Sequence, residues 1–208
     1  MEKLGGNFRI LKMSGEISLE DYEKENWFPE GHILHFDAEA LRDIRKKEAQ
    51  YKAIEYARER EMLISFFPNL QSSLWNNEMM MKLAVEEFLP LVDIVEVSGE
   101  ELEFVAGTTN VEEASEVLLQ GRTKLFIYIQ EGDTTVNDTP ESFEVMVFTR
   151  HSFAEKEGDS TYVVKKGSVV ENFVDSFLWR LCRENVTPEM IEKLDSGTLR
   201  KFLEECLK

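Results

Sequence analysis

The chain has 208 residues, of which 42% are hydrophobic, so it is long enough to build a substantial core. Its 41 acidic residues outnumber the 24 basic ones and give a net charge of −17, which argues against binding to nucleic acid or to an anionic membrane. No apolar run approaches the roughly 18 residues of a membrane-spanning helix. The first residues, MEKLGGNFRI, lack the apolar centre of a signal peptide, and two cysteines make no disulfide framework. These features predict a soluble, cytoplasmic protein.

Helical and strand patterns alternate along the chain. Residues 38–61 are charged and rich in helix formers, which predicts a long helix. The run MLISFF at 62–67 is continuously apolar until Pro68 ends it, as expected of a strand buried on both faces. The other predicted elements are a helix at 78–89, a strand at 92–97, short helices at 99–106 and 111–119, a strand at 125–129, antiparallel strands at 143–148 and 162–164, and a helix from Val174 onward.

This order of elements predicts an α/β fold. Strands that are joined through helices form parallel pairs by right-handed crossovers, and helices then cover the sheet. The sequence therefore predicts a layered fold with a mainly parallel central sheet flanked by helices. It contains no internal repeat and no low-complexity linker, so residues 1–208 are expected to form a single domain.

Polar residues follow several of the predicted strands. In an open α/β sheet, functional groups collect just beyond the carboxyl ends of the strands. Here those positions hold FPNLQ at 67–71, SGEE at 98–101 and QEGD at 130–133, and a further acid, Asp175, stands at the head of the last helix. These segments are the candidates for a functional site.

Each candidate residue also has a purely structural explanation. Asn69 after Pro68 is ordinary turn chemistry. Ser98 is a good helix N-cap, and Glu101 three residues later would complete a capping box. Asp175 could be the N-cap of its own helix. Taken singly, none of these residues indicates a function.

Their order and spacing carry a family resemblance. HILHFDAEAL begins at His32, FPNLQ is followed by Leu74-Trp75, and the strand DIVEV enters SGEELEFVAG at Ser98. In this order the segments resemble the PfkB (ribokinase-like) carbohydrate kinases over nearly the whole chain, and the fructokinase branch most closely. The Leu-Trp pair and the SxxELEF segment are its most specific parts. The resemblance implies a ribokinase-like fold.

The resemblance also implies a reaction and its residues. Kinases of this family transfer the γ-phosphoryl group of ATP, with Mg²⁺, to a sugar hydroxyl, and a fructose-like sugar is implied here. Asp175 stands at the position of the catalytic base, which accepts the hydroxyl proton. Asn69, Ser98 and Glu101 stand at positions associated with phosphate and Mg²⁺, and no side chain is assigned as a direct metal ligand.

The same alignment shows departures from the family pattern. Asn172-Phe173-Val174 replaces the Gly-Ala-Gly that cradles phosphate, and the bulky side chains oppose a close backbone approach or a positive φ. The nucleotide loop is represented by Ile129, Glu131 and Gly132, without the hydroxyl and the first glycine of the family pattern.

Two further departures lie at the end of the strand at 62–67. Phe67 and Gln71 replace an Asp and an Arg of the family pattern, which removes one acid and one bidentate anion ligand. Together, these changes predict a degenerate kinase that is inactive.

The ends of the resemblance suggest alternatives. Compared with the family's sequences, the resemblance begins midway through the lid region and stops before the segment that lines the adenine pocket. The fold is therefore expected to be incomplete at both ends. An exposed sheet edge would then be covered by a partner chain or in a homo-oligomer. Three hypotheses stay open: a degenerate kinase, an active sugar kinase that uses Asp175, and a non-catalytic binding or regulatory subunit completed by a partner.

Two other patterns are given a structural interpretation. His32 and His35 suggest a metal site. However, HILHF at 32–36 is expected to be a short buried strand, whose alternation would place the two side chains on opposite faces, so no metal ligation is expected. Met79, Met80 and Met81 are expected to fill the core beneath their helix.

Overall fold

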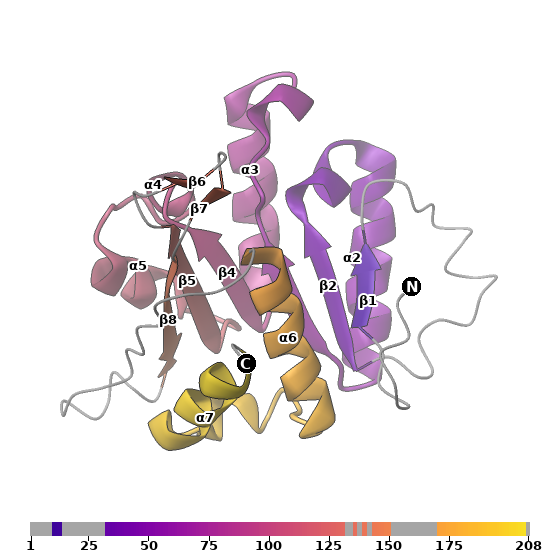
Figure 1. Ribbon diagram of the computed structural model, residues 1–208. Coiled ribbons are helices and arrows are strands. Elements are labelled where there is room, and N and C mark those ends of the chain that lie inside the picture. The colour runs from indigo at the N-terminus through magenta and orange to yellow at the C-terminus, as the bar shows by residue number, and fades with distance from the viewer. Residues whose placement is uncertain are drawn as a thin grey trace.

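The computed structural model describes residues 10–13, 32–131, 135–136, 139–140, 143–150 and 170–206. A six-stranded sheet in the order β1-β2-β3-β4-β5-β8 forms its centre (Figure 1). Neighbouring strands from β1 to β5 are parallel, and β8 is antiparallel to β5. The strands are β1 (Ile10–Met13), β2 (Ile33–Asp37), β3 (Leu63–Phe67), β4 (Ile94–Ser98), β5 (Leu125–Glu131) and β8 (Phe143–Thr149), with a small separate pair, β6 (Thr135–Val136) and β7 (Thr139–Pro140).

Helices cover both faces of this sheet. One face carries α2 (Ile44–Glu59), α3 (Glu78–Phe88), α4 (Leu102–Ala106) and α5 (Val111–Leu118), and the other carries α6 (Val170–Arg183) and α7 (Ser196–Cys206) (Figure 1). Strand alternation divides the apolar side chains between two cores: Leu34 and Phe36 of β2 pack with the first group of helices, whereas Ile33 packs with the second. The predicted α/β fold with a mainly parallel sheet is therefore confirmed.

Local sequence sets where the helices begin and end. The side chain of Asp43 caps α2 by accepting hydrogen bonds from the N–H groups of Arg45 and Lys46, each at 3.0 Å. Asn77 caps α3 and Asn110 caps α5 in the same way. The short helix α4 ends at Gly107, whose φ of 75° is a left-handed conformation that glycine adopts without strain.

Three sequence predictions about these elements are corrected. The helix predicted from Val174 onward is divided into α6 and α7, and α6 begins at Val170 rather than Val174. The helix predicted at 99–106 begins only at Leu102, after a turn. Of the three methionines expected in the core, only Met81 is buried; Met79 and Met80 are 66% and 51% exposed.

The strand predicted at 162–164 lies outside the described residues. Within the part of the chain that is described, no helix is both long and apolar enough to cross a membrane.

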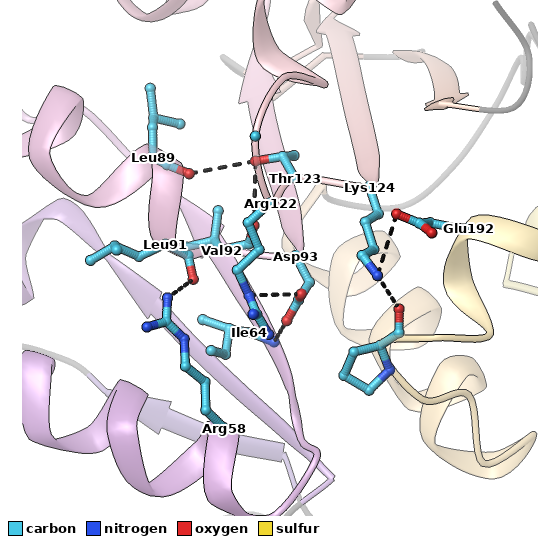
Figure 2. Close-up of polar contacts among 12 residues, drawn as sticks. Arg58, Ile64, Leu89, Leu91, Val92, Asp93, Arg122, Thr123, Lys124 and Glu192 are labelled. Carbon is cyan, nitrogen blue, oxygen red and sulfur yellow. Dashed lines mark hydrogen bonds and ion pairs between the residues drawn. The ribbon is translucent and has the colours of Figure 1, made fainter.

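A buried acid ties strands together at the edge where the parallel strands begin. Asp93 precedes β4 and is fully buried, and its Oδ2 accepts a hydrogen bond from the N–H of Ile64 at 3.0 Å (Figure 2). Its Oδ1 lies 3.1 Å from Nε of Arg122. Burial raises the pKa of the Asp93 carboxyl, and the charge of Arg122 opposes that rise.

Basic side chains reinforce the same edge. Arg58 of α2 donates to the carbonyl of Leu91 at 3.2 Å. Lys124 donates to the carbonyl of Pro188 at 2.7 Å and lies 3.4 Å from Glu192, so it joins the start of β5 to the segment between α6 and α7 (Figure 2). These cations bond to main-chain carbonyls and internal acids, which indicates a structural role for this edge.

Gln50 offers a prediction about stability. This α2 side chain is fully buried, and neither polar atom of its amide has a hydrogen-bond partner among the described residues. A buried amide without partners is destabilising by about 1–3 kcal/mol. Replacing Gln50 with Met, which has a similar shape and no strong polar group, is therefore expected to raise the free energy of unfolding by about 1–2 kcal/mol. Urea denaturation measures this change, and a lower stability for Gln50→Met would contradict it.

Candidate functional site

The predicted site residues lie at the edge where β2, β3, β4 and β5 end. Because these strands are parallel, their carboxyl ends meet at one edge of the sheet. The helix α6 runs opposite to them, so its amino-terminal end lies toward the same edge (Figure 1). The topology therefore gathers the turns after the strands and the start of α6 on one side of the molecule.

Glu101 links the turns that follow β3 and β4. Its side chain is buried, with 8% of the residue exposed. Oε2 accepts hydrogen bonds from the N–H of Ser98 at 3.1 Å and from the Ser98 hydroxyl at 2.7 Å, while Oε1 accepts one from the N–H of Leu70 at 2.5 Å. The predicted capping box includes a hydrogen bond from the N–H of Ser98 to the Glu101 carboxylate, and this bond is present. The helix itself starts later than predicted, because α4 begins at Leu102, after Glu101.

Asn69 and Asp37 form a second link, between β2 and β3. Asn69 has a left-handed backbone with φ of 44°, which asparagine tolerates better than most residues, and its side chain is hydrogen-bonded to Asp37. Asp37 Oδ1 also accepts a hydrogen bond from the N–H of Ala40 at 3.3 Å. Burial raises the pKa of the Asp37 carboxyl, and the hydrogen bonds from Ala40 and Asn69 oppose that rise.

Asp37 is a site residue that the sequence interpretation did not select. The available signal was an acid at the end of the apolar run HILHF, a position just beyond a buried strand. Its proximity to Asn69 depends on the pairing of β2 with β3, in which Asp37 is the register partner of Phe67. The sequence interpretation did not include the register between β2 and β3, whose paired residues lie 30 positions apart in the chain.

The positions predicted for a nucleotide loop lie in a strand. The sequence predicted that this strand ends at Ile129, but β5 continues to Glu131. Ile129 pairs with Val145 of β8, and Glu131 pairs with Phe143. Ile129 is 1% exposed and belongs to the core beneath α6 and α7. Gly132 lies outside the described residues. Ile129 and Glu131 therefore have the extended backbone of a strand rather than of a turn, and their assignment to a nucleotide site stays a prediction.

A close contact holds the end of β5 against the turn after β4. The N–H of Gly99 donates to the carbonyl of Ile129 at 2.8 Å. A Cβ at Gly99 would stand 2.3 Å from Oε1 of Gln130, so only glycine allows the observed position of the Gln130 side chain. The Gln130 Oε1 in turn accepts a hydrogen bond from the hydroxyl of Tyr128.

The predicted anion turn lies inside α6. Asn172, Phe173 and Val174 have helical backbone, and Phe173 and Val174 are 2% and 5% exposed. The ring of Phe173 packs against Phe143 of β8, with ring centroids 5.8 Å apart. In a helix that begins at Val170, the N–H groups of Phe173 and Val174 bond to carbonyls four residues earlier and are not available to an anion, whereas the N–H of Asn172 lies in the first turn and has no intrahelical acceptor.

Asp175 is therefore neither an N-cap nor the end of a turn, which corrects both sequence interpretations of its local structure. It lies in the second turn of α6, about 8 Å along the axis from the helix start at a rise of about 1.5 Å per residue. The residue is partly exposed, beside the buried stripe that contains Phe177 and Leu178. Its assignment as a base stays a prediction.

The chemistry of the assembled residues does not favour a triphosphate. The hydrogen bonds described for Asp37 and Glu101 come from backbone N–H groups, a hydroxyl and an amide, without a Lys or Arg. Among the described residues, no group of three or more His, Cys, Asp or Glu side chains is placed to hold a metal ion. His35 instead lies 3.0 Å from the hydroxyl of Ser65, which donates to Glu96.

Curated proteins similar in sequence are fructokinases. Fructokinase of Escherichia coli is 28% identical over 100 residues, covering 48% of this chain and 32% of that protein. Fructokinase-1 of Oryza sativa subsp. japonica is 25% identical over 174 residues, covering 84% of this chain and 50% of that protein. The chain thus spans half or less of the length of these relatives. No family model matches it.

Solved structures similar in fold include fructokinases and a PfkB protein. A fructokinase from Xylella fastidiosa with bound ATP superposes with a TM-score of 0.68 at 18% identity, covering 93% of this chain and 56% of that one. A PfkB protein from Polaromonas sp. JS666 superposes with a TM-score of 0.60 at 18% identity, covering 90% and 60%. The fold is therefore the ribokinase-like α/β fold.

The sequence relatives then specify the family within this fold. The chain is a homologue of the PfkB carbohydrate kinases and groups with their fructokinase branch. The family predicted from the strand-end segments is confirmed.

Proposed function

We propose that this chain is a degenerate carbohydrate kinase, which keeps the family scaffold but does not transfer a phosphoryl group. The observation that carries the proposal is the burial of Phe173 and Val174 inside α6, at the positions of the family's glycine turn. Phosphoryl transfer depends on hydrogen-bond donors that face the transferred phosphoryl group. The N–H groups of Phe173 and Val174 are bonded within the helix and do not face such a group.

The residues present do not fit ATP and Mg²⁺. Both oxygens of Glu101 accept hydrogen bonds from the protein, and Ile129 and Glu131 belong to a paired strand. A solved relative was crystallised with ATP, and the fructokinase of Vibrio cholerae with fructose, ADP and a calcium ion. For this chain, ATP, Mg²⁺ and a fructose-like sugar are proposed ligands only in the alternative of an active kinase, with Asp175 as the base.

A non-catalytic subunit is the second alternative. In the described residues, β1 and β8 are the outer strands of the sheet, and an outer strand can pair with another chain. A partner chain or a second copy would then complete the sheet, and the single domain at 1–208 would serve as a binding or regulatory module in the cytoplasm. Size-exclusion chromatography with light scattering tests for self-association.

An ADP-release assay tests the proposed loss of activity. The chain is incubated with ATP, Mg²⁺ and fructose, and Asp175→Asn is the matched variant. We expect no ADP above the level of a reaction without protein, and no difference between the two proteins. ADP release that requires fructose and disappears in Asp175→Asn would overturn the proposal in favour of an active kinase.

A further inference from the structure

We propose that the outer sides of α2 and α3 form an interface through which two copies of this chain associate. Four apolar side chains on these helices are at least half exposed: Ile44 at 70%, Met79 at 66%, Met80 at 51% and Leu83 at 50%. Exposed apolar side chains that are scattered singly are ordinary, whereas a group of them on adjoining helices indicates an interaction site. These four residues define the α2–α3 face, which is distinct from the outer strands β1 and β8.

Contacts between α2 and α3 place the exposed side chains next to one another. Lys47 and the Tyr51 hydroxyl of α2 both donate to the carboxylate of Glu87 on α3, the hydroxyl at 2.6 Å. Ile44 lies three residues before Lys47, and Leu83 lies four residues before Glu87. Both helices follow parallel strands and pack on the same face of the sheet, so they run in the same direction. Since residues three or four positions apart share one side of a helix, Ile44 and Leu83 both lie one turn before this contact between the helices.

Met79 and Met80 continue the same surface by one further turn of α3. They precede Leu83 by four and three residues, which places them along its side of the helix. The stripe that α3 buries in the core consists of Met81, Ala84, Val85 and Phe88. The exposed methionines therefore lie outside the core on which the helix packs. Methionine is enriched at protein interfaces, where its unbranched side chain adapts to the opposing surface.

The charges of the two helices favour a second copy of the chain as the partner. α2 contains five basic and three acidic residues, a net charge of +2, whereas α3 contains one basic and three acidic residues, a net charge of −2. The two helices together are neutral in a chain whose net charge is −17, so the rest of the chain carries all of that charge. Two copies therefore repel each other less through the α2–α3 face than through the remainder of their surface.

A two-fold axis makes this charge pattern self-complementary. In a symmetric dimer of this kind both copies use the same surface patch. With α2 of each copy against α3 of the other, a helix of net charge +2 faces one of net charge −2 at two places. Burial of the apolar side chains of the α2–α3 face stabilises the dimer, and the opposite charges favour this orientation over the alternatives.

Sedimentation equilibrium of the full chain tests the interface, with Leu83→Glu as the main variant. We expect the native chain, of 24.2 kDa, to dimerise with a dissociation constant of about 1–100 μM, as for a small interface. Leu83→Glu brings two like charges together across the two-fold axis and is expected to weaken dimerisation by at least about 100-fold. Val117→Glu is the matched control, because Val117 is an apolar residue of α5 with 48% exposure outside the α2–α3 face. Its dimerisation should equal that of the native chain.

The possible results separate this interface from pairing through the outer strands of the sheet. Circular dichroism first establishes that each variant is folded, and Met80→Glu provides a second variant if Leu83→Glu is not. A native chain that stays monomeric at about 1 mM, well above the expected dissociation constant, would overturn the interface. Unchanged dimerisation in folded Leu83→Glu or Met80→Glu would also overturn it and favour pairing through β1 or β8, and equal weakening by Val117→Glu would show an effect of added charge alone.

Charge reversal tests the orientation of the two copies. Arg45→Glu with Lys52→Glu changes the net charge of α2 from +2 to −2, and Glu78→Lys with Glu86→Lys changes that of α3 from −2 to +2. All four positions are exposed. Each double variant then carries charges of one sign on both helices and is expected to be monomeric where the native chain dimerises, whereas an equimolar mixture of the two should form a heterodimer. Failure of the mixture to form a heterodimer, or dimerisation of either variant alone, would overturn the pairing of α2 with α3.

Discussion

Replacing Asn172-Phe173-Val174 with the family's Gly-Ala-Gly is expected to unfold the protein rather than restore a kinase site. Truncating buried Phe173 to Ala costs about 3–5 kcal/mol. A glycine inside a helix costs about 1 kcal/mol relative to alanine, and two are introduced into α6. The loss of at least about 5 kcal/mol is comparable to the whole stability of many domains.

A volume-conserving variant separates core packing from sequence identity. Phe173→Leu with Val174→Ile keeps an apolar filling of this core and is expected to lower the free energy of unfolding by less than about 1.5 kcal/mol per site. Urea denaturation followed by circular dichroism measures both variants. A Gly-Ala-Gly variant with native stability would mean that these residues are not core residues, and the explanation of the altered turn would be wrong.

Asp93→Ala is expected to have the next largest effect. The substitution leaves the N–H of Ile64 without its acceptor and removes the carboxylate that lies 3.1 Å from Nε of Arg122. Breaking a buried ion pair by removing one partner costs about 3–5 kcal/mol; the partly exposed Arg122 favours the lower end. Asp93→Asn keeps an acceptor for Ile64 and should cost less than Asp93→Ala. Equal stability of Asp93→Ala and the native chain would contradict the structural role of this edge.

The pH dependence of stability provides a separate readout of Asp93. Its pKa is raised in the folded chain above the ordinary value of 3.8, so the folded state binds this proton more tightly than the unfolded state. The stability contributed by this group is present below pH 3.8 and is lost as pH rises through the raised pKa. Asp93→Asn should remove that part of the pH dependence, which urea denaturation at a series of pH values can measure.

Much of the fold could be predicted because its strands are buried on both faces. Apolar runs such as MLISFF and VDIVEV do not alternate, and they form β3 and β4 within one residue or two of the predicted ends. β1 was not predicted, since a four-residue strand carries little pattern of its own. Met79 and Met80 were misplaced because the helical stripe of α3 buries Met81 and leaves its neighbours outside.

The site was less predictable because its geometry depends on contacts between distant residues. The resemblance to the family placed Asn172 to Val174 in a turn. In the structure Phe173 and Val174 are buried, which favours a helix that starts earlier, at Val170. Hydrophobic burial therefore decides the local structure there. The Asp37–Asn69 pair and the link from Glu101 to Leu70 arise from strand register, which a local sequence pattern does not contain.

Calorimetric titration of the native chain with ATP and Mg²⁺ tests the central claim most directly. That claim is that a carbohydrate kinase scaffold has incorporated its phosphate-binding turn into a packed helix. It predicts no saturable heat of binding at millimolar nucleotide. Saturable binding with a dissociation constant well below 1 mM, weakened by excess ADP, would contradict it.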